Sequence, residues 1–211
     1  MHPKTSPPAD SVFQAGSGLV LIPVALWATI VAVLGGTGAF QAEAAGIPVV
    51  LVATVLAPPT VFAALYRAFA SVRYWVDSLD ITTVVAIQAW RVIGGTFVFL
   101  WLMGRLPAAF AIPAGFGDVA VGVGAAIIVA KVANREFGWQ SRVRLLIIFG
   151  MLDFVAALAT GILTRQGLPL HFEGAPPADI MQTLPMVMIP GFAVPAFIIF
   201  HMIAWIKLRE M

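Results

Sequence analysis

Residues 107–130 read PAAFAIPAGFGDVAVGVGAAIIVA, an apolar run that holds a single charged side chain, Asp118. A stretch of this length is enough to cross the hydrocarbon core of a bilayer as a helix, which takes about 20 mostly apolar residues. Its apolar residues are continuous rather than alternating, which is not the pattern of a strand in a membrane barrel. We therefore predict a transmembrane helix over 107–130, since a helix satisfies its own backbone hydrogen bonds in lipid.

Other stretches of the chain have the same length and character. The predicted spans are 18–38, 47–69, 80–103, 107–130, 143–164 and 184–206. The connections between them are short, and the longest, 165–183, has no room for a folded domain. The sequence thus predicts an all-α, polytopic membrane protein: a single bundle of about six transmembrane helices over 18–206, with a tail at 1–17 and a C-terminus at 207–211.

The overall composition agrees with a membrane protein. Of the 211 residues 61% are hydrophobic and only 10% are charged, whereas soluble domains are about 45–50% apolar and about 25% charged. This composition excludes an ordinary soluble enzyme, a disordered chain and a nucleic-acid binder. The chain has no cysteine, which excludes disulfides, thiolate metal sites and cysteine nucleophiles. No metal-ligand spacing is present, and we predict no metal and no cofactor.

The basic residues predict the orientation of the bundle, because cytoplasmic loops carry an excess of Lys and Arg. With the N-terminus inside, only Arg105 and Arg165 fall on the outer side. The inner side then carries Lys4, Arg67, Arg73, Lys131, Arg135, Arg142, Arg144, Lys207 and Arg209. We therefore expect both termini to be cytoplasmic, in a multi-pass protein of a bacterial-type inner membrane.

Three charged residues lie inside the predicted spans: Arg91, Asp118 and Asp153. Gln88 precedes Arg91 by three residues and shares its helix face, and His201 lies in the last span. Intramembrane charges are costly and usually face the bundle interior or a water-filled cavity. Since small residues flank them at helical spacing, which marks faces where helices approach closely, we expect these groups to meet near the middle of the membrane.

The signs of the three charges are unequal. One Arg and two Asp leave one carboxyl group over, and this group must be protonated, bind a cation or face water. A carboxyl group poised in this way is what proton relays and cation-coupled carriers use. The alternative is that Arg91 bridges both acids as a purely structural link, with Gln88 donating a hydrogen bond. Which Asp pairs with Arg91 is left open by the sequence.

Prolines predict interruptions in three spans. Pro58 and Pro59 lie in the second, Pro113 in the fourth, and Pro190 and Pro195 in the sixth. Broken helices beside charged residues are typical of transporter binding sites. In the fourth span we expect the regular helix to begin near Pro113, which would put its positive dipole end close to Asp118.

Residues 115–118 (GFGD) resemble the GxGD motif of intramembrane aspartyl proteases, and 195–197 (PAF) resembles their PAL element. The resemblance implies that Asp118 and Asp153 would act as a catalytic acid and base. In that family, however, the other catalytic Asp lies upstream of GxGD. Upstream of 115 this chain has no Asp within a span, and Asp80 lies only at the inner end of one.

These observations favour an integral membrane transporter or channel for a small solute or ion, proton-coupled through Arg91, Asp118 and Asp153. The alternatives are a non-catalytic membrane subunit or sensor, a protease-like enzyme using Asp118 and Asp153, and a redox protein that binds haem or quinone. The expected partners are the lipid bilayer, a small solute or ion, and a second copy or a membrane subunit. The residues of the expected polar site are Gln88, Arg91, Asp118, Asp153 and His201.

Overall fold

The computed structural model describes the backbone of residues 9–43 and 45–211, and the side chains from residue 21 onward within those ranges. This part of the chain is helical, with no strand. Its elements are α1 (Ala9–Gly36), α2 (Val49–Ala68), α3 (Ala70–Ser78), α4 (Ile81–Ile87), η1 (Gln88–Gly94), α5 (Gly95–Leu102), α6 (Ala108–Ala133), α7 (Trp139–Leu163), η2 (Ala178–Gln182), η3 (Ile189–Ala193) and α8 (Val194–Arg209).

Five helical segments are long and apolar enough to cross a membrane: Val49–Ala68, Ile81–Leu102, Ala108–Ala133, Trp139–Leu163 and Ile189–Arg209. They match five of the predicted spans, and the prediction of a multi-pass helical membrane protein is confirmed to that extent. The first predicted span, 18–38, falls in α1, whose described side chains form a shorter apolar helix, Leu21–Gly36. Helix α1 already begins at Ala9, directly after Pro8, so residues 9–17 of the expected tail are helical.

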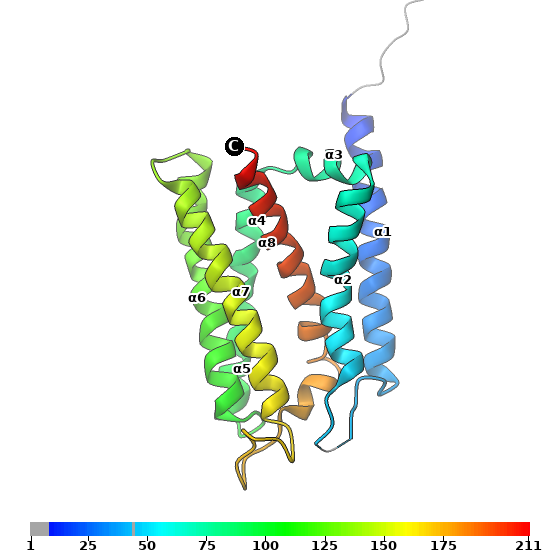
Figure 1. The fold of residues 1–211 in the computed structure, drawn as a ribbon, viewed down its shortest axis with the longest axis vertical. Coiled ribbons are helices and arrows are strands. Elements are labelled where there is room, and N and C mark those ends of the chain that lie inside the picture. The colour runs from blue at the N-terminus through cyan, green and yellow to red at the C-terminus, as the bar shows by residue number, and fades with distance from the viewer. Residues whose placement is uncertain (1–8, 44) are drawn as a thin grey trace, which may run out of the picture.

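The long helices run side by side (Figure 1). α6 and α7 stand next to α4, η1 and α5, while α8 lies between this group and α2, with α1 beyond α2. The described start of α1, helix α3 and the C-terminus lie at one end of the bundle, which we call the α3 end. The loops 37–48 and 164–188 lie at the opposite end, which we call the Arg165 end.

Helix α3 crosses the α3 end of the bundle and connects α2 to α4 (Figure 1). In the predicted spans, residues 70–79 are only the connection between 47–69 and 80–103. Val76 is fully buried and Tyr74 is 75% exposed, as expected for an amphipathic helix at the bundle surface. Lys207 of α8 donates from Nζ to the carbonyl groups of Val76 and Asp77, both at 3.1 Å. A lysine at this position donates to carbonyl groups of the last turn of α3, as basic side chains do at helix C-termini.

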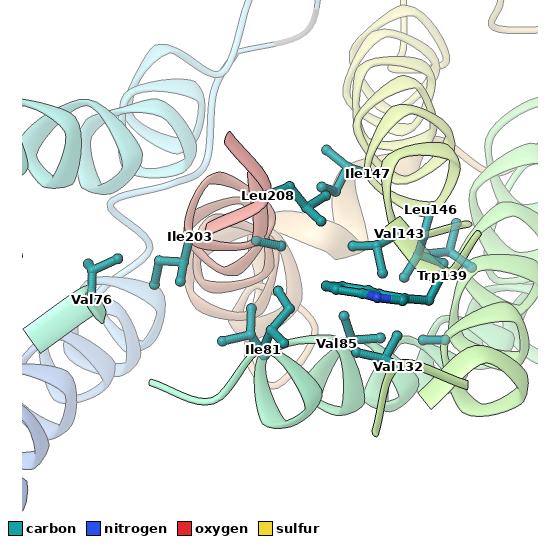
Figure 2. Close-up of a cluster of buried hydrophobic side chains, with 14 of the residues drawn as sticks. Val76, Ile81, Val85, Val132, Trp139, Val143, Leu146, Ile147, Ile203 and Leu208 are labelled. Atoms are coloured by element: carbon teal, nitrogen blue, oxygen red, sulfur yellow. The ribbon is translucent and has the colours of Figure 1, made fainter. Parts of the chain in front are cut away.

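The main hydrophobic core joins α4, α6, α7 and α8 near the α3 end (Figure 2). Trp139, the first residue of α7, lies flat among Val85 of α4, Val132 of α6 and Val143 of α7. Leu208 reaches the same cluster from α8. The indole of Trp139 is buried and packs the ends of these helices together.

The prolines interrupt fewer helices than the sequence predicts. α2 continues through Pro58 and Pro59, and α6 begins at Ala108 and continues through Pro113. The expected helix start near Pro113, close to Asp118, is therefore wrong. In a membrane helix the carbonyl groups freed by proline can find other partners, so a kink or break is not obligatory. Of the three described spans in which prolines predict interruptions, only the last departs from α-helix, in the π-helical segment Ile189–Ala193 that contains Pro190.

Candidate functional site

The third span changes its helical form at the charged residue. Residues Gln88–Gly94 form a 3₁₀ helix between α4 and α5. A 3₁₀ helix has 3.0 residues per turn, so side chains at i and i+3 eclipse one another. Gln88, Arg91 and Gly94 accordingly lie on one line, and all three are buried, whereas Trp90 is 70% exposed. The buried line faces α6, α7 and α8, and Arg91 itself is 1% exposed.

Arg91 bridges both acids. Its Nε donates to Oδ1 of Asp118 on α6 at 2.7 Å, and its Nη2 donates to Oδ2 of Asp153 on α7. Its Nη1 donates to the carbonyl oxygen of Gly150, on the same helix as Asp153, at 3.3 Å. The sequence left the partner of Arg91 open, and in the structure the partner is both carboxylates. One guanidinium thus links three spans through charge-assisted hydrogen bonds.

His201 of α8 completes the cluster. Its Nε2 lies 3.3 Å from Nη1 of Arg91. Because a guanidinium only donates hydrogen bonds, Nε2 is the acceptor, and the ring is neutral with its hydrogen on Nδ1. The guanidinium of Arg91 also lies over the ring of Phe154, with the guanidinium carbon 3.8 Å from the ring centroid. This cation–π contact further stabilises the positive charge of Arg91, which is buried away from water.

Glycines on neighbouring helices make room for the charged side chains. A Cβ atom at Gly94 would overlap the side chain of Asp118, and one at Gly117 would overlap the carboxyl group of Asp153. A Cβ atom at Gly150 would overlap His201 and lie 2.7 Å from Nη1 of Arg91. Gly150 shares a helix face with Asp153, as the spacing of the sequence indicates, whereas Gly94 and Gly117 come into contact with the acids only through the packing of the helices. Gly94 lies opposite Asp118 because of the 3₁₀ winding.

Gln88 lies beside the cluster but is not part of it. Its Nε2 donates to the carbonyl oxygen of Phe197 on α8 at 3.2 Å. Its Oε1 is buried and has no hydrogen-bond partner among the described residues. Gln88 thus donates its hydrogen bond to α8 and none to the two acids. Gln88 instead ties the 3₁₀ segment to α8, next to the π-helical stretch.

Each titratable group of the cluster lines a different cavity. Asp118 and Phe154 lie in a narrow cavity of about 80 Å³ that extends to Arg165 and Gln182 at the Arg165 end. Asp153 lies in a groove of about 660 Å³ between α6 and α7. His201 lies in a groove of about 480 Å³ between α2, α7 and α8, with Arg67 and Arg209 toward the α3 end. A cavity of 80 Å³ has room for a few water molecules.

Comparison with known proteins gives a family. Residues 47–209 match the family described as a domain of unknown function, DUF8737. The chain belongs to this family. The matched region runs from α2 to the last residue of α8, so every residue of the cluster lies inside the DUF8737 domain and α1 lies outside it. No curated protein and no solved structure matches the chain.

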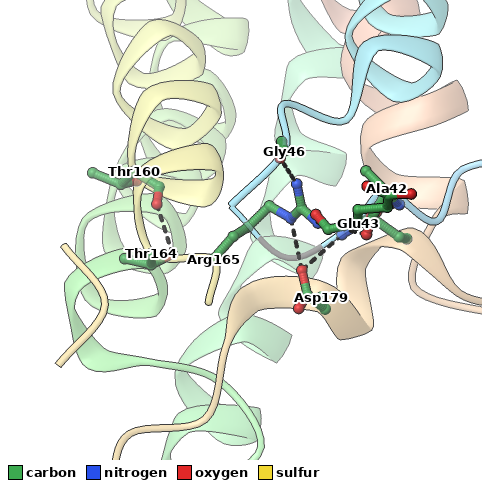
Figure 3. Close-up of polar contacts among 8 residues, drawn as sticks. Ala42, Glu43, Gly46, Thr160, Thr164, Arg165 and Asp179 are labelled. Carbon is green, nitrogen blue, oxygen red and sulfur yellow. Dashed lines mark hydrogen bonds and ion pairs between the residues drawn. The ribbon is translucent and has the colours of Figure 1, made fainter. Parts of the chain in front are cut away.

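A second buried arginine of the DUF8737 domain, Arg165, connects two loops at the Arg165 end (Figure 3). Arg165 follows α7 and is 2% exposed. Its Nε donates to Oδ1 of Asp179 at 2.7 Å, and its other nitrogens donate to the backbone carbonyl groups of Ala42, Glu43 and Gly46. The sequence places Arg165 in an exposed outer loop. The structure makes it the link between the α1–α2 connection and the segment before α8.

The geometry of the cluster bears on the alternative functions. In aspartyl proteases two carboxyl groups share a proton at short range, whereas here the guanidinium of Arg91 lies between Asp118 and Asp153. This arrangement does not favour the protease-like alternative. The Nε2 of His201 already accepts from Arg91, which does not favour His201 as a haem ligand.

Proposed function

We propose that this DUF8737 protein is an integral membrane transporter for a small solute or ion, coupled to protons through Arg91, Asp118 and Asp153. One observation carries the proposal. The two carboxyl groups share Arg91 yet line separate cavities, and the cavity of Asp118 extends to the Arg165 end. A charged site deep in the bundle that separate cavities reach supports transport by alternating access, in which a central site opens to each side in turn.

The charge of the cluster supports proton coupling. Arg91 balances one carboxylate, and the neutral His201 balances none, so the second carboxylate is balanced by a proton or by a bound cation. Since arginine stays protonated in proteins, the exchangeable proton resides on Asp118 or Asp153. Arg91 holds the two groups in place and stabilises whichever is ionised. Protonation from one cavity and release into another would move one proton per cycle.

The flux of protons tests this proposal. We expect Asp118→Asn and Asp153→Asn each to lower proton-linked flux in proteoliposomes by about 100-fold or more, the usual scale for loss of a proton-transfer group. Both variants should fold, because each leaves one carboxylate paired with Arg91. The measurement is the dissipation of an imposed pH gradient, read with an entrapped pH-sensitive dye.

The matched control is Glu173→Gln, the same change of acid to amide on an exposed loop residue outside the cluster. We expect it to leave the flux unchanged. Wild-type flux in both cluster variants would overturn the proposal. It would favour the second candidate, a non-catalytic membrane subunit in which Arg91 is a structural link, since nearly every donor of this arginine is already paired within the protein.

We also propose that the α3 end is cytoplasmic, in a bacterial-type inner membrane, with α1 as the sixth span. The excess of Lys and Arg on this side supports the orientation. The chain has no cysteine of its own, so single cysteines report cleanly. We expect a membrane-impermeant maleimide to label Glu173→Cys in intact cells and Asn134→Cys only after permeabilisation. The reverse pattern would contradict this orientation.

A further inference from the structure

The groove between α6 and α7 has a small-residue floor and apolar walls. Gly117, Ala120 and Gly124 of α6 form the floor, and Phe149 and Leu152 of α7 are among the walls. Phe149 is 62% exposed, so in a membrane this face of the bundle meets lipid rather than water. The volume of about 660 Å³ lies within the range of about 300–1,000 Å³ that is usual for small-molecule sites.

A carboxyl group lies at one end of this groove. The side chain of Asp153 is 10% exposed, and its Oδ2 is paired with Arg91. Its Oδ1 lies against Gly117, where a Cβ atom would overlap it, and accepts no hydrogen bond from any residue that the structure describes. The groove thus ends on a carboxyl group, one oxygen of which accepts no hydrogen bond from the described residues.

The surrounding charges favour a cation at this place. The groups that face Asp153 are Arg91 from η1, which it shares with Asp118 of α6, and the neutral His201 of α8, which contacts Arg91. With both acids ionised, these groups sum to one negative charge. The only other charged residue that lines the groove is Arg142 on α7, about 16 Å away along the helix.

We infer that the groove binds a membrane-soluble amphiphilic cation, with its cationic centre at Asp153 and its apolar body along Gly117, Ala120 and Gly124. The inference rests on the proposed transport function and names its substrate class. Arg142 repels the cationic end, which sets the orientation. The headgroup of a bilayer lipid stays at the interface, whereas Asp153 lies deep in the span, so the occupant is a free amphiphile.

The exchange balances in charge. In the empty groove the carboxyl group of Asp153 holds a proton. When the cation enters, the O–H bond breaks and the carboxylate left behind pairs with the cation. The proton leaves to water through the cavity of Asp118, which extends to the Arg165 end. One positive charge enters for each that leaves, so the cluster remains neutral and the coupling is an exchange of a proton for a cation.

The test is the binding of tetraphenylphosphonium to the full-length protein in detergent, measured by isothermal titration calorimetry. We expect binding to strengthen as the pH rises, and to release about one proton per cation when two buffers of different ionisation enthalpy are compared. Asp153→Asn should weaken binding at least about tenfold, the scale of one charge-assisted contact.

A steric pair of variants tests the place of binding. Ala120→Phe fills the groove from an exposed position and should weaken binding by at least about tenfold, since it displaces the ligand's apolar body. Val123→Phe, at another exposed position on α6 outside the groove, should leave binding unchanged. Binding that is absent in the wild type, or unaffected by both Asp153→Asn and Ala120→Phe, would overturn the inference.

The binding test and the proton-flux test can give different results, so each proposal can fail without the other. Loss of proton flux in the Asp118 and Asp153 variants, with no binding of tetraphenylphosphonium by the wild type, would leave transport standing and overturn the substrate class. Binding with the expected dependence on Asp153 and Ala120, together with unchanged flux in the variants, would support the cation site and overturn transport.

Discussion

Replacing Arg91 with methionine is expected to lower the free energy of unfolding by about 3–5 kcal/mol, because it removes the only cation paired with two buried carboxyl groups. Ionised carboxylates only accept hydrogen bonds, so Asp118 and Asp153 cannot bond to each other. Their shared partner, Arg91, is 1% exposed. Methionine keeps an unbranched apolar chain of much the same volume as the aliphatic part of arginine, so the lost charge dominates the effect. The measurement is denaturant unfolding in detergent micelles, followed by the intrinsic fluorescence of tryptophan.

The control for this prediction removes the acids as well. In the triple variant Arg91→Met, Asp118→Asn, Asp153→Asn no net charge remains in the cluster, and we expect it to recover most of the lost stability. Replacing a whole buried ion cluster by neutral groups is often tolerated, whereas removing one partner is not. A single Arg91→Met variant as stable as the wild type would show that the carboxyl groups are not held in ionised form by this arginine.

The spans and the intramembrane charges could be predicted because lipid imposes a strict rule on the sequence. A charged residue in a long apolar run must face the bundle interior or a water-filled cavity. Arg91, Asp118 and Asp153 can therefore be recognised without any knowledge of the fold. The direction in which they point was also readable, since glycines mark the faces where helices approach. Gly117 and Gly150 accommodate the neighbouring charged side chains in this way.

The winding of the third span was less predictable. In both a regular α-helix and a 3₁₀ helix Gln88 and Arg91 share a face, but the two forms differ one turn later. The 3₁₀ segment turns Gly94 toward Asp118 and Gly95 toward Val119. Nothing in the local sequence signals this change, because the segment is selected by close packing against α6 rather than by helix propensity.

The contacts of Arg165 could not be predicted from the sequence, for a different reason. The carbonyl groups that Arg165 reaches lie 119 to 123 residues away in the chain. Such contacts leave no periodic pattern, and a basic residue in a loop reads only as a topology signal. The sequence nevertheless offered one indication of the ion pair. The segment 165–183 contains acidic residues, and one of them, Asp179, is the partner of Arg165.

A close approach between the backbones of two helices predicts the second large effect, at Gly122 of α6. We expect Gly122→Ala to lower the free energy of unfolding by about 1–3 kcal/mol, the usual cost of overpacking. The new Cβ atom would lie 2.7 Å from the backbone nitrogen of Val92 and 3.1 Å from the carbonyl oxygen of Ala89. Backbone atoms cannot rotate away as a side chain can, so the 3₁₀ segment that carries Arg91 would have to move.

Gly124→Ala provides the matched control, two residues along the same helix. Its new Cβ atom would lie 3.6 Å from Cδ1 of Leu146, an ordinary contact, and alanine favours a helix over glycine by up to about 1 kcal/mol. We therefore expect this variant to be as stable as the wild type or slightly more so. Unfolding of both variants in detergent gives the comparison. Equal stability of the two would mean that α6 and the 3₁₀ segment are not in direct backbone contact. Because Gly122 faces the segment that carries Arg91, its alanine variant should also weaken proton-linked flux.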